Sequence, residues 1–303
     1  MRSLMFLILT LVTALVVAET PAEKGLAIAI EADKRDTGWV DFKAKMKMTL
    51  RNKQGQESTR TIKLSSQEVL NDGDKSLSIF SSPRDIKGTA FLSYTHALKP
   101  DDQWLFLPAL KRVKRISSAN KSGPFVGSEF AFEDFTTTEL GKFTYKFLRE
   151  EEIADVKMDV VERIPQYKNS GYTKQITWID QDVFQGRKLE FYDRKGDLLK
   201  TLMLKDYRKY GGVWRAQTLS MVNHQNGKST DLVYGDYEFK TGLAEREILL
   251  KAFWNVLAKR FYRVSFSSAW VASAAALTLG VVSAAAAGEL ELGGALGFEL
   301  RAF

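Results

Sequence analysis

Residues 40–50 read Val-Asp-Phe-Lys-Ala-Lys-Met-Lys-Met-Thr-Leu, and this stretch decides the fold. Apolar and polar residues alternate along its whole length, and the apolar positions are Val40, Phe42, Ala44, Met46, Met48 and Leu50. A period of two is typical of an antiparallel strand with one face on a core and the other in water. We therefore predict that a one-sided β-sheet begins here.

Turn-forming residues follow at regular intervals. Residues 52–56 contain Gly55 and lead into a second strand-like run at 58–64, where Ile62 and Leu64 continue the apolar face. Further turn sequences stand at residues 71–74, 193–196, 211–212 and 226–227. Asn-Gly and Asp-Gly steps between strand-like runs indicate hairpins. No proline follows residue 167, so the later strands keep all their backbone donors.

Helical patterns are few, at residues 24–35, 82–86 and 243–262. No internal repeat or low-complexity linker precedes residue 263. We therefore predict a mainly β protein with a few helices (α+β), in which consecutive hairpins form one antiparallel sheet.

The N-terminus has the features of a secretory signal. Arg2 precedes an uncharged run at residues 4–17 that ends in small residues before Ala18. About 14 apolar residues are too few to anchor a helix across a bilayer, which takes roughly 20. We predict a signal peptide at residues 1–18, cleavage after Ala18 and export to the periplasm.

The composition is that of a folded chain, with 45% hydrophobic and 27% charged residues. There is no cysteine, so thiol catalysis and disulfides are excluded and stability must come from burial. The formal net charge of +7 favours anionic lipid surfaces or acidic partners, without by itself indicating nucleic acid.

Four sequence blocks resemble a known family. They are residues 81–92 (SSPRDIKGTAFL), 104–116 (WLFLPALKRVKRI), 125–135 (FVGSEFAFEDF) and 188–200 (KLEFYDRKGDLLK). In this order they are similar to motifs of the periplasmic outer-membrane lipoprotein-sorting family, relatives of the LolA and LolB carriers. Blocks and strands together span about residues 25–250.

The resemblance implies a strongly curved antiparallel sheet, a half-barrel with a helical lid around an apolar concavity. Such a concave face is either filled by the protein's own side chains or left open for a lipid tail. We place ten residues at the concavity as candidate lipid-binding residues: Met46, Met48, Phe91, Trp104, Phe106, Trp178, Phe191, Met203, Trp214 and Met221. Methionine suits a surface that must fit chains of varied shape.

Charged residues next to these blocks suggest polar contacts. The basic cluster of Lys111, Arg112, Lys114 and Arg115 is a candidate contact for lipid head groups or for an acidic partner, or else a charged, solvated strand edge. Glu133 and Asp134 are expected to pair with this cluster or to cap a turn.

The sequence offers no recognisable catalytic motif. His96 and His224, the two histidines, fall in strand-like segments, and neither has the spacing of a metal site or a triad. No phosphate-binding glycine loop or G-x-S-x-G elbow is present. We predict a protein that is not an enzyme and that needs no cofactor or metal.

The composition changes after residue 262. Residues 264–288 carry no charge, and 269–287 form an alanine-rich apolar run. Three interpretations compete: a membrane anchor, a helix packed on the sheet, or a second signal-like segment from a fusion with another exported chain. We divide the chain into a signal peptide (1–18), a carrier domain (19–262) and an atypical tail (263–303).

Two functions fit these observations. The first is a carrier that binds lipid or lipoprotein acyl chains, with an inner-membrane exporter, such as one of the resistance-nodulation-division type, or an outer-membrane acceptor as partner. The second is a non-catalytic interaction module of an envelope assembly. A cavity of several hundred cubic ångströms would favour the first, and a filled core with an exposed apolar patch the second.

Overall fold

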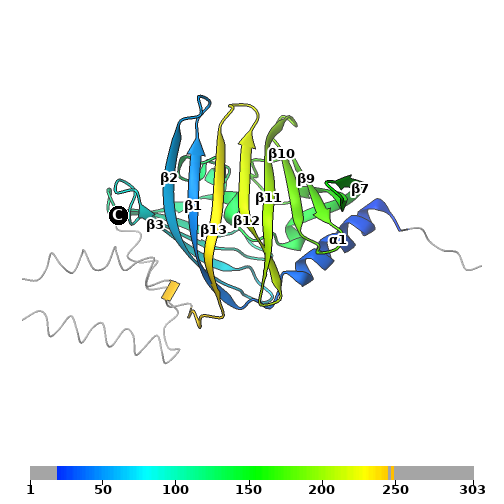
Figure 1. Cartoon of the computed structure of the whole chain (residues 1–303), viewed down its shortest axis with the longest axis horizontal. Helices are drawn as coiled ribbons and strands as arrows, with labels where there is room; N and C mark the ends of the chain where they lie inside the picture. Colours follow the sequence, from blue (N-terminus) through cyan, green and yellow to red (C-terminus); the bar gives the residue numbers. More distant parts are fainter. Residues whose placement is uncertain (1–18, 245–246, 249–303) are drawn as a thin grey trace, which may run out of the picture. The chain divides into compact units, whose positions relative to one another are not determined.

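The computed structural model describes residues 19–244, 247 and 248, which belong to the first of two units, Met1–Ala252 and Phe253–Phe303. Within these residues it holds one α-helix, four short 3-10 helices and a 13-stranded antiparallel sheet (Figure 1). The strands are β1 (Asp41–Arg51), β2 (Glu57–Gln67), β3 (Lys75–Ser82), β4 (Ala90–Tyr94), β5 (Asp102–Leu107), β6 (Arg112–Ile116), β7 (Phe143–Ile153), β8 (Val156–Pro165), β9 (Lys174–Asp180), β10 (Gly186–Tyr192), β11 (Leu198–Tyr210), β12 (Val213–Asn223) and β13 (Ser229–Phe239).

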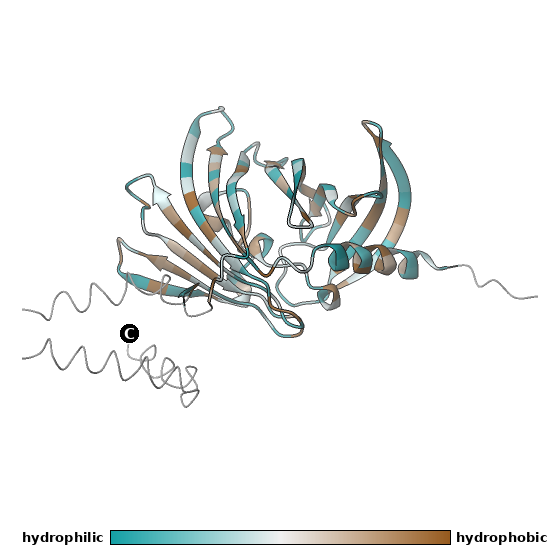
Figure 2. Ribbon diagram, turned by 60° about the horizontal axis from the view of Figure 1, so that its bottom comes forward, coloured by the Kyte–Doolittle hydropathy of each residue, from teal (hydrophilic) through white to brown (hydrophobic). Residues whose placement is uncertain are grey.

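The strand order is β6-β5-β4-β3-β2-β1-β13-β12-β11-β10-β9-β8-β7. Two runs of hairpins therefore meet where β1 pairs with β13, and the strong curvature of the sheet is visible in Figure 2. Strands β6 and β7 lie at opposite edges, so the chain between them has to travel from one edge to the other. The predicted mainly β, curved antiparallel fold is confirmed.

The deciding stretch forms β1 as predicted. Ala44, Met46 and Met48 are buried, whereas Lys45 and Lys47 are exposed. Val40 is the exception, because its φ of 66° ends the extended conformation and its side chain is 52% exposed. The carboxylate of Glu68 accepts hydrogen bonds from the Gly38 and Val40 amides at 2.7 and 2.8 Å, which turns the chain just before the strand.

The predicted turns each join neighbouring strands of the sheet. Gly196, Gly211 and Gly227 adopt positive φ values in three of them, a conformation that glycine accepts without steric cost. The sequence signals for hairpins are thus confirmed.

The first predicted helix is confirmed as α1 (Pro21–Arg35), which begins three residues earlier than predicted. Thr20 and Glu23 form a capping box at its start, and Gly25 lets the helix approach β7 closely. A Cβ at Gly25 would lie 2.6 Å from the Phe147 backbone nitrogen. In Figure 1 the helix runs beside β7.

The second predicted helix, at residues 82–86, is wrong. Ser82 ends β3, and a turn follows up to Gly88, whose φ of 87° suits a turn rather than a helix. The third predicted helix covers residues 243–262. In it Leu243 is not helical, whereas Glu247 and Ile248 are helical. Its remainder, the signal peptide at 1–18 and the tail at 263–303 lie outside the described residues.

The connection from β6 to β7 crosses the concave face and fills part of it. It contains the 3-10 helices η1 (Ser118–Asn120), η2 (Phe125–Gly127), η3 (Phe132–Phe135) and η4 (Leu140–Lys142). Phe125, Phe130 and Phe132 are buried with inward side chains of the sheet such as Met46 and Met221. We call residues 123–135 the crossing segment, and it forms the main core with the sheet.

Candidate functional site

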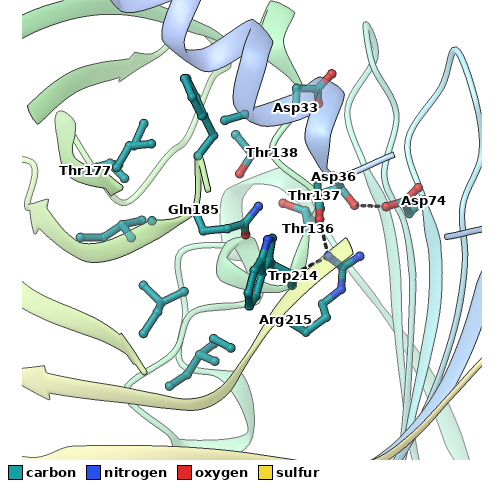
Figure 3. A pocket seen from close by; sticks show the side chains of 18 of the residues that line it. Asp33, Asp36, Asp74, Thr136, Thr137, Thr138, Thr177, Gln185, Trp214 and Arg215 are labelled. Carbon is teal, nitrogen blue, oxygen red and sulfur yellow. Dashed lines mark hydrogen bonds and ion pairs between the residues drawn. The ribbon is translucent and has the colours of Figure 1, made fainter. Parts of the chain in front are cut away.

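The rest of the concave face is open. A cavity of about 560 Å³ lies among inner side chains of the sheet, α1 and residues 135–140 (Figure 3). Its walls are mostly apolar and aromatic, and they include Ala29, Ala32, Phe42, Val161, Ile179, Phe184, Leu189, Leu204, Trp214, Leu219, Tyr234 and Tyr237. This volume is within the range of roughly 300–1,000 Å³ that is usual for small-molecule sites.

The cavity and the main core share a boundary. Phe135, Leu204 and Leu219 pack against the core cluster on one side and line the cavity on the other. Phe135 ends the crossing segment, and its ring packs against that of Phe125, with 4.3 Å between the two ring centroids. The crossing segment therefore decides how much of the concave face remains open.

Acidic groups gather on one side of the cavity. Asp36, at the end of α1, pairs with Arg215, and Asp74 accepts a hydrogen bond of 2.9 Å from the Thr137 hydroxyl (Figure 3). Burial raises the pKa values of Asp33 and Asp36, and it raises the pKa of Asp74 to about 6. Desolvation likewise raises the pKa of nearby Glu139 to about 7.

These raised pKa values predict that the protein becomes less stable as the pH rises. Folded Asp74 and Glu139 keep protons that the unfolded chain loses near its ordinary values of 3.8 and 4.5. Their stabilising contribution is therefore complete below those values and is lost as pH rises to about 6 and 7. We expect urea unfolding at pH 5, 6 and 7 to show a falling free energy of unfolding, with a flatter profile in Asp74→Asn and Glu139→Gln.

The matched control for that experiment is Asp197→Asn, which changes an exposed carboxylate and should leave the profile as it is in the wild type. Identical profiles in all four proteins would contradict the assignment of the pH dependence to Asp74 and Glu139.

Another wall of the cavity carries polar groups of a different kind. Tyr145 of β7, Arg163 of β8 and Thr177 of β9 all line it. Tyr145 is paired with Arg163 across the strands, and Thr177 lies opposite Val161. Figure 3 shows Thr177 on one side of the view and Asp36 and Asp74 on the other. The cavity thus combines apolar walls with two polar regions, and the neighbouring residues Thr137 and Thr138 each bond to one of them.

The structure divides the ten predicted lipid-binding residues among three locations. Trp214 lines the cavity. Five belong to the main core beneath the crossing segment: Met46, Met48, Phe91, Phe191 and Met221. The other four are Trp104, Phe106, Trp178 and Met203. Each of these four is next in sequence to an inward residue such as Leu105, Thr177 or Leu204, so alternation directs it to the opposite face of the sheet.

The basic cluster lies on the hairpin at one edge of the sheet. Lys111 adopts a φ of 48° in the turn, and the other three residues belong to edge strand β6. Arg115 pairs with Asp102, while Arg112 and Lys114 are exposed. Contact of this cluster with head groups or a partner stays a prediction.

Glu133 and Asp134 do not contact the basic cluster but bind other partners. Glu133 accepts a hydrogen bond of 2.8 Å from the Gly171 amide. Asp134 caps the turn at Ala131 with a bond of 2.7 Å and forms a 2.7 Å ion pair with Lys200. The expected turn cap is therefore confirmed, and the expected pairing with the basic cluster is wrong.

Both histidines lie just outside strands rather than within them. His96 follows β4, and its Nδ1 lies 2.8 Å from an Asp72 carboxylate oxygen. His224 follows β12, with Nε2 2.8 Å from the Thr201 hydroxyl. Among the described residues, no group of three or more histidines, cysteines or carboxylates is arranged to hold a metal ion. In the same part of the chain, no helix combines the length and hydropathy that a bilayer crossing requires.

The sequence does not predict several of the residues that line the cavity. Ala29, Ala32 and Asp33 come from α1, and residues 136–138 belong to the crossing connection, whose path no local pattern reveals. Arg163 did leave a signal, because it stands two residues after Val161 and so shares that residue's inner face. A charged residue on an inner face is uncommon enough to indicate a site.

Comparison with known proteins places this fold in a family. A family model described as "Uncharacterized protein" matches residues 72–247. The structure of an outer membrane lipoprotein-sorting protein domain from Vibrio parahaemolyticus is 54% identical, with a TM-score of 0.74 over 76% of this chain and 99% of that chain. A DUF1329 family protein from Desulfovibrio piger is 26% identical, with a TM-score of 0.72 over 76% of this chain and 97% of that chain.

A third structure shows the same fold at lower identity. It is a LolA superfamily protein from Nitrosomonas europaea, 22% identical, with a TM-score of 0.61 over 74% of this chain and 96% of that chain. A search of curated proteins returned no match. On its 54% sequence identity to the Vibrio domain, the chain belongs to the same family as that outer membrane lipoprotein-sorting protein domain, and it shares the curved-sheet fold of the LolA superfamily protein.

Proposed function

We propose that this protein is a periplasmic carrier that binds an acyl chain of a lipid or lipoprotein in the cavity on its concave face. The observation that carries the proposal is the cavity of about 560 Å³, walled by apolar side chains such as Leu204, Leu219 and Trp214. Its cargo would come from an inner-membrane exporter or pass to an outer-membrane acceptor, as the family resemblance implies.

The energetics favour reversible binding. Burying a methylene group is worth about 0.8 kcal/mol, so ten shielded methylenes would contribute about 8 kcal/mol before the cost of ordering the chain. Binding of this kind needs no catalytic group and no cofactor. The alternative, a non-catalytic interaction module, gives no reason for an open cavity beside a well-packed core.

A native mass spectrum of the protein, purified from the periplasm of a Gram-negative host, tests the proposal. We expect a stoichiometric lipid or acylated species on the wild type and its loss in Leu204→Glu. The reason is that Leu204 lines the cavity, and a carboxylate there would lose its hydration when an acyl chain enters.

The matched control is Met203→Glu, one residue away on the same strand and on the opposite face. This variant should keep its cargo. A wild-type protein that carries nothing and takes up no fatty amphiphile would contradict the carrier, and equal loss in both variants would contradict the choice of this cavity.

A further inference from the structure

The polar wall of the cavity contains a cation without a partner of opposite charge. Arg163 is half-buried, and its Nε donates a 2.6 Å hydrogen bond to the Gln175 side-chain oxygen. Its Nη1 donates to the Thr138 hydroxyl at 3.3 Å. Both acceptors are neutral, and within the described part of the chain no carboxylate lies at ion-pair distance from this guanidinium. Desolvation lowers the pKa of Arg163, and the negative charge of Asp134 acts in the opposite direction without forming an ion pair.

Two hydroxyl groups on the same wall also lack partners. Tyr145 and Thr177 are each 9% exposed, and neither side-chain oxygen makes a hydrogen bond in the described structure. An unsatisfied buried hydroxyl costs roughly 1–3 kcal/mol, so proteins rarely keep one without use. Burial raises the pKa of Tyr145 to about 12, so its hydroxyl remains a donor.

These three groups come from adjacent strands and line one cavity. Arg163 on β8 pairs with Tyr145 on β7 and with Gln175 on β9. Thr177 stands two positions after Gln175 on β9, so it lies on the same face of the sheet. A guanidinium with two hydroxyl donors matches the needs of a planar carboxylate or of a phosphate. The remaining walls suit an apolar chain.

We propose that the cavity selects amphiphiles with an anionic head, a carboxylate or a phosphate, and that Arg163, Tyr145 and Thr177 bind this head. This inference rests on the proposed function and names the class of its ligand. The acyl chain then extends along the apolar walls at Leu204 and Leu219.

The acidic side of the cavity defines the competing outcome. When they are ionised, Asp33, Asp74 and Glu139 repel an anion and attract a cation, and Asp33 and Glu139 also act on Tyr145 through their charge. Asp36 is already paired with Arg215. An anionic head is therefore placed at Arg163 and away from Asp74, whereas a cationic head would bind at the acidic side.

The test uses four ligands with one chain length: hexadecanoate, hexadecyl phosphate, hexadecanol and hexadecyltrimethylammonium. Each is titrated into the delipidated full-length protein by competition with a fluorescent fatty-chain probe. We expect at least one anionic ligand to bind about tenfold more tightly than hexadecanol. Comparison of the two anionic ligands identifies whether carboxylate or phosphate is preferred.

Variants assign the effect to the proposed residues. Arg163→Met should reduce binding of the preferred anion to the level of hexadecanol, while Arg208→Met, which removes an exposed positive charge on β11, should change nothing. Tyr145→Phe and Thr177→Val should each weaken anion binding about threefold. Because neither hydroxyl makes a hydrogen bond now, both variants should keep or raise the wild-type melting temperature.

The outcomes are distinguishable from those of the carrier test. Equal binding of all four ligands, or tightest binding of the ammonium, would overturn the anionic head site and leave the carrier intact. An Arg163→Met protein with the wild-type preference for anions would overturn it as well. If no ligand binds at all, the carrier fails, and the head site fails with it.

Discussion

Asp134→Ala is expected to lower the free energy of unfolding by about 3–5 kcal/mol, as is typical when one partner of a buried ion pair is removed. Lys200 Nζ lies 2.7 Å from the Asp134 carboxylate, and their side chains are only 3% and 7% exposed. The same carboxylate accepts a 2.7 Å hydrogen bond from the Tyr172 hydroxyl. Without Asp134, the ammonium of Lys200 would remain buried with the Glu129 carbonyl as its other acceptor.

Two further variants separate the cost of an unpaired buried charge from the cost of losing a side chain. The double variant Asp134→Ala/Lys200→Met should be more stable than Asp134→Ala alone, because no unpaired charge remains buried. Lys45→Met breaks an exposed pair with Asp236 and should cost less than about 1 kcal/mol. Urea denaturation measures all three variants. A single-variant cost as small as that of Lys45→Met would show that the buried pair does not hold the fold.

The ion pair between Lys200 and Asp134 matters for function because it attaches the crossing segment to the sheet. Lys200 belongs to β11 of the sheet, whereas Asp134 and Glu129 belong to the crossing segment. Glu133, whose pKa is raised by burial, adds bonds to Gly171 and Ser170. These contacts fix the crossing segment over one part of the concave face, and the other part remains open as the cavity.

The sequence predicts the sheet well because its signals are local. Alternation at residues 40–50 and the turn residues at 193–196 and 226–227 each act within a few positions, and the structure confirms them. Helix α1 is likewise predicted by its own local pattern, although the capping box of Thr20 and Glu23 places its start three residues earlier than predicted. By contrast, five residues at 82–86 were too few to indicate a helix.

The site was harder to predict because it depends on long-range geometry. Alternation shows that Leu202 and Met203 face opposite sides, but not which side is concave, since both faces of several strands are covered. Met46 was expected on the concave side and does lie inward, yet the crossing segment covers it. The path of that segment follows from the positions of β6 and β7 at opposite edges, which no local pattern in the sequence reveals.

The second large effect is expected at the centre of the crossing segment. Phe125 is fully buried, and its ring centroid lies 5.1 Å from that of Phe91 and 5.5 Å from that of Phe132. Phe125→Ala should destabilise the protein by about 3–5 kcal/mol, through lost burial and the cavity left behind. Phe125→Leu should cost less, and Leu110→Ala, at a site 68% exposed, should change stability by less than about 0.5 kcal/mol.

Urea unfolding of these variants also tests whether the crossing segment acts as one unit. Phe125 attaches the segment by packing and Asp134 attaches it by charge, so either change alone should loosen the same piece of chain. The double variant Phe125→Ala/Asp134→Ala should therefore cost less than the sum of the single variants. Strict additivity would mean that the two contacts hold energetically independent parts of the structure.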